Sequence, residues 1–173
     1  MKDLKNKTEI VFEVNALSKL KEIEDKKILI MTDSFIAKSV LMKELLKNIN
    51  SSNKVIIYDK VMPDPSLEIV GQSLALYIKE DIDIIVGFGG GSSIDSAKGV
   101  IYFASEVSHK DIYFIAIPTT SGTGSEVTSV AVLKDNDTQV KHLLQSDDML
   151  PDLAILDPCL VKELPKKNIA NTG

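Results

Sequence analysis

The stretch DIDIIVGFGGGSSIDSAKGVI, residues 81–101, decides the fold. An apolar strand over Asp83–Phe88 is expected to run straight into three glycines (Gly89, Gly90 and Gly91), and a helix is expected over Ser92–Ser105. Glycine permits positive φ and a close approach of the backbone to a ligand. A strand, a glycine turn and a helix in this order therefore predict an α/β fold with a ligand site at the turn.

Working outward, strands and helices alternate from Lys27 to Pro118. Each crossover is long enough for a helix and too long for a hairpin, which predicts a parallel sheet with right-handed crossovers. The fold class is α/β, a doubly wound parallel sheet. Strands are expected at Lys27–Thr32, Val55–Tyr58, Asp83–Phe88 and Ile112–Ile117, and helices at Phe35–Lys47, Pro65–Glu80 and Ser92–Ser105.

The flanking segments add smaller elements. Thr8–Glu13 alternates as a strand does, and Asn15 is a candidate N-cap for a short helix through Ile23. An added β-hairpin is expected from Val130–Leu133 and Val140–Leu144, because a turn signal lies between these runs. Leu153–Leu156 is the last short apolar run. We expect residues 1–173 to form one nucleotide-binding α/β domain.

Composition excludes several classes of protein. The chain has 173 residues, a net charge of −5 and both signs of charge spread along it, which argues against a nucleic-acid or anionic membrane surface. The start, MKDLKNKTEI, lacks the apolar segment of a secretory signal. Cys159 is the only cysteine, and neither histidine, His109 or His142, has a partner at metal-ligand spacing. These features favour the cytoplasm.

The glycine turn is the first candidate site. A helix start offers free amides and a partial positive charge, which suit a pyrophosphate. The spacing Gly87-x-Gly89-x-x-Ser92 nearly matches the dinucleotide pattern, with serine in place of the last glycine. The alternative is a bare strand-to-helix turn. Asp95 is then a residue that interacts with the helix dipole, and Lys98 a surface lysine with a packed stem.

Two acids and a polar loop follow other strand ends. Asp33 suits an adenosine ribose, where it would repel a 2′-phosphate, or equally a helix N-cap. Asp64, before Pro65, meets the same alternatives, with the cap favoured. The loop Thr119–Ser129 carries seven hydroxyl side chains, which suit a polar ligand or a plain surface loop. Within it, Thr123-x-x-Glu126 fits a capping box.

The motifs together resemble the iron-dependent (group III) alcohol dehydrogenases. The resemblance rests on GGGSSIDSAK at Gly89–Lys98 and IPTTSGTGSEVTS at Ile117–Ser129. PDPS at Pro63–Ser66, LPDLAILDP at Leu150–Pro158 and the closing NTG support it. Within the family the chain is most similar in appearance to the 1-propanol and ethanol dehydrogenases of bacterial microcompartments, so the resemblance places it in the cytoplasm or inside such a compartment.

The resemblance implies a Rossmann-like domain that binds NAD(H), followed in the family by a helical domain that holds Fe²⁺ or Zn²⁺. The family's metal ligands, one aspartate and three histidines, begin beyond the motif matched by Asn171-Thr172-Gly173. This chain therefore resembles the cofactor-binding half of an enzyme that interconverts alcohols and aldehydes, without metal ligands or catalytic residues. By itself such a half is expected to lack turnover.

The resemblance also implies a place for each matching residue along the cofactor. These places are Asp33 at the adenosine ribose; Gly90, Gly91 and Ser92 around the pyrophosphate, supported by Gly89 and Asp95; Thr119 and Thr120 on the adenine side; Thr123 and Thr128 toward the nicotinamide; Lys141 at the nicotinamide ribose; and Asp64 as a further polar contact. A standard dinucleotide fold would instead place the ribose acid near Asp111.

One departure concerns the amino-terminal turn. The family commonly has F-G-x-G-A-L, while this chain reads Phe12-Glu13-Val14-Asn15-Ala16-Leu17, so both glycines are lost. Family members often dimerise through the preceding strand, here Thr8–Glu13, and a homodimer or higher oligomer is the expected assembly. Two alternatives remain open, a glycerol or polyol dehydrogenase of the same superfamily and a non-catalytic nucleotide-binding and dimerisation module.

Overall fold

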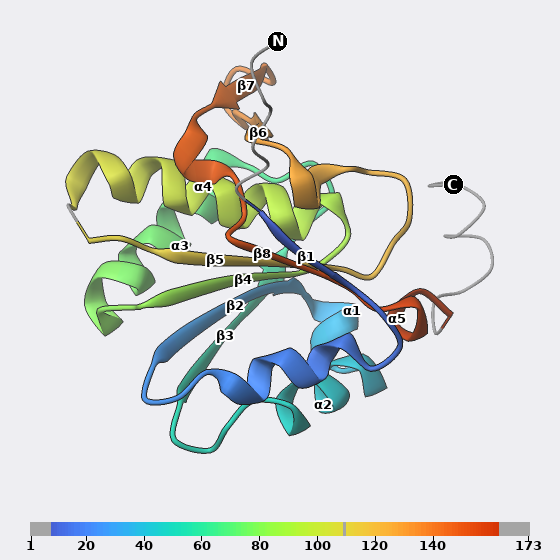
Figure 1. The fold of residues 1–173 in the computed structure, drawn as a ribbon. Coiled ribbons are helices and arrows are strands. Elements are labelled where there is room, and N and C mark those ends of the chain that lie inside the picture. The colour runs from blue at the N-terminus through green and yellow to red at the C-terminus, as the bar shows by residue number, and fades with distance from the viewer. Residues whose placement is uncertain (1–7, 109, 163–173) are drawn as a thin grey trace, which may run out of the picture.

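The computed structural model describes residues 8–108 and 110–162. Six parallel strands form one sheet in the order β1-β8-β5-β4-β2-β3, and helices lie on both of its faces (Figure 1). The strands are β1 (Glu9–Phe12), β2 (Lys27–Asp33), β3 (Lys54–Val61), β4 (Ile84–Gly89), β5 (Tyr113–Pro118) and β8 (Leu153–Leu156). The predicted doubly wound α/β fold is confirmed.

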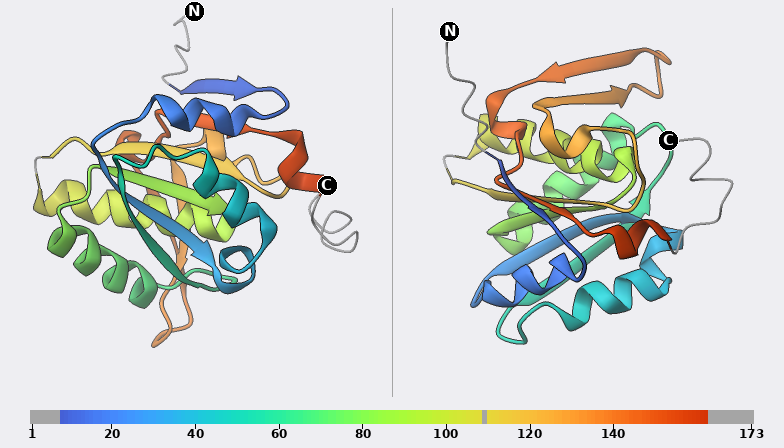
Figure 2. Two further views of the ribbon diagram at one scale, coloured as in Figure 1. Left: turned by 90° about the horizontal axis from the view of Figure 1, so that it is seen from below. Right: turned by 45° about the vertical axis from the view of Figure 1, so that its right-hand side comes forward.

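The helices follow the predicted alternation. They are η1 (Ala16–Glu22), α1 (Ser34–Ala37), α2 (Val40–Lys47), α3 (Leu67–Glu80), α4 (Gly91–Val107), η2 (Ser125–Val127), η3 (Asp147–Met149) and α5 (Pro158–Lys162). Two views in Figure 2 show η1, α1 and α2 on one face of the sheet and α3 and α4 on the other. No helix among the described residues is long and apolar enough to cross a bilayer.

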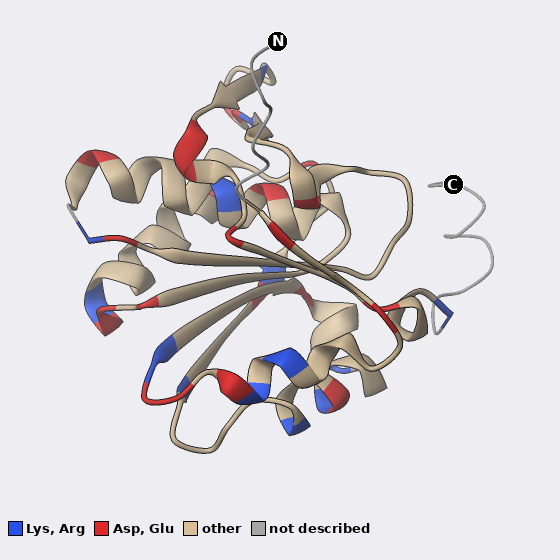
Figure 3. Cartoon of the chain, viewed as in Figure 1, with Lys and Arg blue, Asp and Glu red and all other residues tan. Residues whose placement is uncertain are grey.

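Alternate residues of the central strands pack into two separate hydrophobic cores, one on each face of the sheet. In β4, Ile84, Val86 and Phe88 pack on the side of α1 and α2, while Ile85 packs on the side of α3 and α4. Side chains alternate between the faces of a strand, so a strand buried on both faces must be apolar at every position. The strands β4, β5 and β8 carry no charged residue, and in Figure 3 many of the charged residues lie on the helices and at the strand ends.

The expected helix over Phe35–Lys47 is divided in two. The Ser39 hydroxyl accepts a hydrogen bond from the Leu41 amide at 3.1 Å and donates one to the Ile36 carbonyl at 2.7 Å. A serine side chain can replace backbone partners in this way, which ends α1 and caps α2. The prediction missed the break because the apolar pattern continues through it.

The segment before α3 also differs from the expectation. Ser66, and not Asp64, is the N-cap of α3, and its hydroxyl accepts a hydrogen bond from the Ile69 amide at 3.3 Å. Asp64 lies two residues earlier with φ 56°. The interpretation of Asp64 as a cap is therefore wrong, and its carboxylate is free for another partner.

The predicted hairpin is confirmed as a two-stranded antiparallel sheet of β6 (Val130–Lys134) and β7 (Lys141–Gln145). Asp135 organises the turn, since its Oδ1 accepts hydrogen bonds from the amides of Asp137 at 2.8 Å and Thr138 at 3.3 Å. The hairpin stands outside the main sheet, beyond α4, as Figure 1 shows.

The amino-terminal turn tolerates the loss of both glycines. Asn15 precedes η1 with φ 63°, in the left-handed region, but its side chain makes no capping hydrogen bond. Asparagine adopts this conformation more readily than most residues, which is why it replaces the second glycine of the family pattern. Glu13, at the first glycine position, is not among the residues with positive φ.

Candidate functional site

The candidate site lies where the strand order reverses. After β2 the chain adds β3 on one side, and it then returns to place β4 on the other side of β2. In such sheets a crevice forms at the carboxyl ends of the two central strands. Those ends are Asp33 of β2 and Gly89 of β4, and a Cβ at Gly89 would lie 3.8 Å from Asp33 Oδ2.

Asp33 is the N-cap of α1. Its Oδ1 accepts hydrogen bonds from the amides of Phe35 at 2.8 Å and Ile36 at 2.9 Å. The cap interpretation is thus confirmed, and it does not exclude a ligand role, because Oδ2 is directed toward the glycine turn. The capping bonds fix the carboxylate at the mouth of the crevice.

The three glycines of the turn differ in backbone conformation and in the groups that they contact. Of the three, only Gly89 uses the positive φ that glycine permits, at 146°. Its carbonyl accepts a hydrogen bond from the Thr119 amide at 2.9 Å, which ties the start of the second loop to β4. Gly87, inside the strand, lets α4 pack closely, since a Cβ there would lie 3.0 Å from Ile94 Cα.

Helix α4 begins at Gly91, one residue earlier than expected, with Gly90 as N-cap. The Gly90 carbonyl accepts the amides of Ser93 at 3.0 Å and Ile94 at 3.3 Å. Gly91 and Ser92 are the first two residues of α4, and their amides belong to the donors that a helix start leaves without an intrahelical partner. This start offers an anion both donors and the positive end of the helix dipole.

Gly90 and Gly91 face the second loop, Thr119–Ser129. A Cβ at Gly90 would lie 3.5 Å from Thr120 Oγ1, and one at Gly91 would lie 3.3 Å from Thr123 Cγ2. The two glycines therefore leave a gap between the helix start and the two threonines that a side chain would fill. Thr120 Oγ1 is buried and has no hydrogen-bond partner among the residues that the structure describes, as expected of an atom that a ligand would satisfy.

The other threonines of the Thr119–Ser129 loop differ in how far they are buried. Thr119 is buried, while Thr123 and Thr128 are exposed. The capping box at Thr123 and Glu126 is wrong in detail: η2 starts at Ser125 after Gly124, which has φ 65°, and no side chain caps it. Glycine at that position allows a left-handed turn that threonine would resist.

Asp95 supports this loop from α4. Its Oδ1 accepts the Ser125 hydroxyl at 2.6 Å, and its Oδ2 accepts the Val132 amide at 3.2 Å. The resemblance implies that Asp95 supports the glycine turn, whereas these two hydrogen bonds join it to the Thr119–Ser129 loop and to β6. The alternative, an interaction with the helix dipole alone, leaves these two hydrogen bonds unexplained.

Lys98 is the site residue that the sequence interpretation missed. Its side chain is fully buried, and Nζ donates to Ser125 Oγ at 3.1 Å, Thr128 Oγ1 at 3.0 Å and the Val130 carbonyl at 2.8 Å. Burial lowers the pKa of Lys98 to about 8, while Asp95 and Glu126 act to raise it. The expectation of a surface lysine is wrong. The spacing Asp95-x-x-Lys98, which puts both on one helix face, was the available signal.

Lys141 and Asp64 lie together at the hairpin. Lys141 Nζ is 2.7 Å from Asp64 Oδ1, and both side chains are more than half exposed. The hydrogen bond from Lys141 lowers the pKa of the Asp64 carboxyl below its ordinary value. The two residues that the resemblance assigns to the cofactor therefore lie on one surface. In this structure their side chains form an ion pair with each other.

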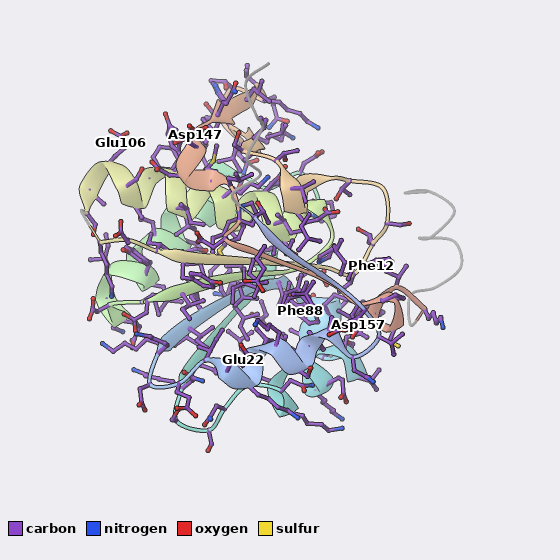
Figure 4. The ribbon with its side chains drawn as sticks, in the orientation of Figure 1. Phe12, Glu22, Phe88, Glu106, Asp147 and Asp157 are labelled. Carbon is purple, nitrogen blue, oxygen red and sulfur yellow. The ribbon has the colours of Figure 1, made fainter. Side chains whose placement is uncertain are left out.

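A pocket of about 510 Å³ adjoins the second loop beside Thr120. Its walls come from β1, the end of β5, the end of β8 and α5. In Figure 4 Phe12 and Asp157 mark this end of the molecule, with Phe88 inside it. The lining is mostly apolar, which suits a flat ring system.

The described residues fit a dinucleotide better than a metal ion. The helix start, the gap opposite Thr120 and Thr123, and Asp33 supply what a pyrophosphate and a ribose require. Within residues 8–108 and 110–162, no three His, Cys, Asp or Glu side chains are grouped to hold a metal ion. His142 is exposed, and His109 and the closing NTG lie outside the described residues.

The sheet order and the site at its reversal define a doubly wound α/β protein. Comparison with known sequences gives the family: the model described as "Iron-containing alcohol dehydrogenase" matches residues 7–158. The chain belongs to the iron-containing alcohol dehydrogenase family, a family of oxidoreductases.

Individual relatives agree with this assignment. The chain is 39% identical over 173 residues to 1-propanol dehydrogenase PduQ of Citrobacter freundii, covering 100% of this chain and 47% of the relative. A solved 1,3-propanediol oxidoreductase superposes with a TM-score of 0.82 at 32% identity, covering 94% of this chain and 47% of the other. Sulfoacetaldehyde reductase from Bifidobacterium kashiwanohense, solved with NAD⁺, gives a TM-score of 0.86 at 26% identity over 96% and 49%. The chain thus spans about half the length of these relatives.

Proposed function

We propose that this chain is the NAD(H)-binding domain, spanning residues 1–173, of a metal-dependent dehydrogenase that interconverts primary alcohols and aldehydes. One observation carries the proposal: the start of α4 and the Thr119–Ser129 loop adjoin at the sheet's reversal, with a gap at Gly90 and Gly91 between them. Family membership supplies the reaction class. When bound, NAD(H) supplies the hydride-transfer chemistry, and the chain binds and orients it.

The proposal includes a path for the cofactor, which the positions of the strand ends and loops support. The pyrophosphate binds the amides of Gly91 and Ser92, and the adenosine ribose binds Asp33 Oδ2. The adenine lies toward the largely apolar pocket beside Thr120, and the nicotinamide lies toward Thr123, Thr128 and Lys141. An acid at the ribose favours NAD over NADP, because it repels a 2′-phosphate.

The metal belongs to the same proposal. Fe²⁺, or Zn²⁺, acts as the metal of the full-length protein, and membership of the iron-containing family supports this part of the proposal. The role that we propose for this chain is to bind and orient the cofactor. We propose that the 173-residue chain binds cofactor without turnover, which is the role of a nucleotide-binding module.

The assembly is proposed to be a homodimer or larger oligomer formed through β1. This strand is at the edge of the sheet and pairs only with β8 among the described strands. Phe12 is 74% exposed and Ile10 45% exposed, so the edge combines unpaired backbone groups with apolar side chains. A cytoplasmic location, including the interior of a bacterial microcompartment, completes the proposal.

Calorimetric titration of the chain with NADH tests cofactor binding directly. We expect one site per chain and weaker binding of NADPH than of NADH. An assay with 1-propanol, NAD⁺ and added Fe²⁺ tests the second part, and turnover above background would contradict the inactive-module proposal. A preference for glycerol in the full-length protein would favour the polyol dehydrogenase alternative.

A further inference from the structure

A polar cluster, which we call the α4 cluster, joins α4 to the end of the Thr119–Ser129 loop and to β6. It consists of Asp95 and Lys98 on α4, the hydroxyls of Ser125 and Thr128, and the backbone groups of Val130 and Val132. An ammonium has three donors, and here three oxygens accept them. The Asp95 carboxylate adds two acceptors, one for Ser125 and one for Val132.

The two ends of the Thr119–Ser129 loop are held by different groups. At its start, the Thr119 amide bonds to Gly89 in the sheet. At its end, the α4 cluster fixes Ser125, Thr128 and the first residues of β6. Between these ends, Ser121, Gly122 and Thr123 are exposed. Gly122 and Gly124 both have positive φ. The loop's middle therefore depends on its two anchored ends.

Burying the charge of a lysine costs desolvation free energy, so a buried lysine stabilises a helix less than an apolar residue does. Its burial lowers its pKa to about 8, and buried charges contribute little net stability compared with apolar residues of similar size. Most other buried positions of α4, such as Ile94, Ala97 and Ile101, are apolar, and the buried polar ones, Ser93 and Ser96, carry no charge. What Lys98 provides, and an apolar side chain would not, is a fixed position for three oxygens of an irregular loop.

We propose that Lys98, with Asp95, is a positioning residue for the nicotinamide side of the cofactor site. It holds Thr128 and the far end of the Thr119–Ser129 loop against α4, while the adenosine side depends on Asp33 and the glycine turn. This inference rests on the proposed NAD(H) site. It predicts that loss of the Lys98 ammonium weakens binding of the dinucleotide and spares binding of its adenosine half.

The test compares Lys98→Met with wild type in calorimetric titrations of NADH and of ADP. We expect NADH affinity to fall about tenfold and ADP affinity to change less than about twofold. Lys79→Met, an exposed lysine on α3, is the matched control and should change neither. Equal losses for NADH and ADP would show general damage, and an unchanged NADH affinity would remove the positioning role.

Amide hydrogen exchange separates this inference from the proposed function. In Lys98→Met, exchange at Val127, Val130 and Val132 should rise about tenfold or more, while the amides of Ile85 and Ile115 in the sheet stay protected. If wild type binds neither NADH nor ADP, the proposed function fails, and exchange still decides whether Lys98 positions the loop. Unchanged exchange at the three valines would overturn the inference.

A second variant covers the case in which Lys98→Met does not fold. Ser125→Ala removes the hydroxyl that both Asp95 and Lys98 contact, at 2.6 and 3.1 Å, and leaves the charge in place. We expect a loss of NADH affinity in the same direction, about threefold, with ADP unaffected. Wild-type affinity for NADH and wild-type exchange in this variant would also refute the inference.

Discussion

Lys141 Nζ lies 2.7 Å from Asp64 Oδ1, although 77 positions separate these residues in the sequence. One comes from the start of β7 and the other from the segment before α3. Beside them, the Lys134 amide donates to the Pro65 carbonyl at 2.8 Å, so the base of the hairpin is tied to the same segment. Two residues that the resemblance assigns to the cofactor are thus opposite ends of one ion pair.

This ion pair competes with the proposed role of Lys141, because its ammonium must leave Asp64 to reach a ribose. Lys141→Met should lower NADH affinity about threefold to tenfold, and Asp64→Asn should leave it unchanged or raise it slightly by freeing the lysine. Calorimetry with NADH measures both. Lys54→Met breaks a pair with Glu80 that is also 2.7 Å long, and it should have no effect because this pair is remote from the site.

The same pair predicts a titration. The hydrogen bond from Lys141 lowers the folded-state pKa of Asp64 below its ordinary value of 3.8. The pair therefore contributes to stability above that value and loses the contribution as pH falls through the lowered pKa. NMR titration of the Asp64 side chain should show a midpoint below 3.8 that moves up in Lys141→Met. An unmoved midpoint would contradict the pairing.

Asp33 allows its two roles to be separated by substitution. Asp33→Asn keeps a capping oxygen for Phe35 and Ile36 but loses the charge, so stability should be nearly unchanged while NADPH binding improves relative to NADH by about tenfold. Asp33→Ala loses both, and should also lower the free energy of unfolding by about 1 kcal/mol. Calorimetry and urea unfolding measure the two effects.

A second N-cap provides the control for Asp33. Ser39 caps α2 through the Leu41 amide, away from the crevice, so Ser39→Ala should cost about 1 kcal/mol of stability without a change in cofactor preference. If Asp33→Asn binds NADPH no better than wild type does, the carboxylate does not face the ribose.

The sequence was informative wherever a local pattern and the tertiary structure agree. The apolar strand over Asp83–Phe88 and the glycines after it predicted β4, α4 and the ligand edge, because a strand buried on both faces leaves few other arrangements. The resemblance predicted that Asp33 and the glycine turn belong to one site. The structure confirms that Asp33 and Gly89 are neighbours.

The failures share a physical cause, which is that polar partners are chosen by three-dimensional proximity. Lys98 and Ser125 are 27 positions apart, and no local pattern shows that a lysine on α4 ends beneath a loop hydroxyl. Asp64 before Pro65 has the local form of a cap, but the chain turns there with positive φ and Ser66 takes the position. Likewise, Ser39 breaks a helix whose apolar pattern continues through it.

Gly91→Ala tests the gap beside the helix start. Gly91 does not have positive φ, so alanine is compatible with the backbone there, but its methyl carbon would lie 3.3 Å from Thr123 Cγ2 in the proposed pyrophosphate space. We expect a change in the free energy of unfolding below about 1 kcal/mol and a loss of NADH affinity of about tenfold or more.

Gly71→Ala is the matched control for that substitution. A Cβ at Gly71, within α3, meets nothing within 4 Å, so alanine should stabilise the fold by about 0.4–1 kcal/mol and leave NADH affinity unchanged. Wild-type NADH affinity in Gly91→Ala would mean that the pyrophosphate does not approach the helix start.

The buried Lys98 predicts that stability depends on pH in an unusual direction. Its pKa is about 8 in the folded chain against 10.5 for an ordinary lysine, so between these values the unfolded chain binds more protons. The free energy of unfolding of wild type should therefore rise with pH relative to that of Lys98→Met, by about 1–2 kcal/mol from pH 7 to pH 9.5. Urea unfolding of both proteins at the two pH values measures this difference, and the comparison cancels the tyrosines that titrate in the same range. A difference that stays constant would show that Lys98 keeps its ordinary pKa and that water reaches its ammonium group.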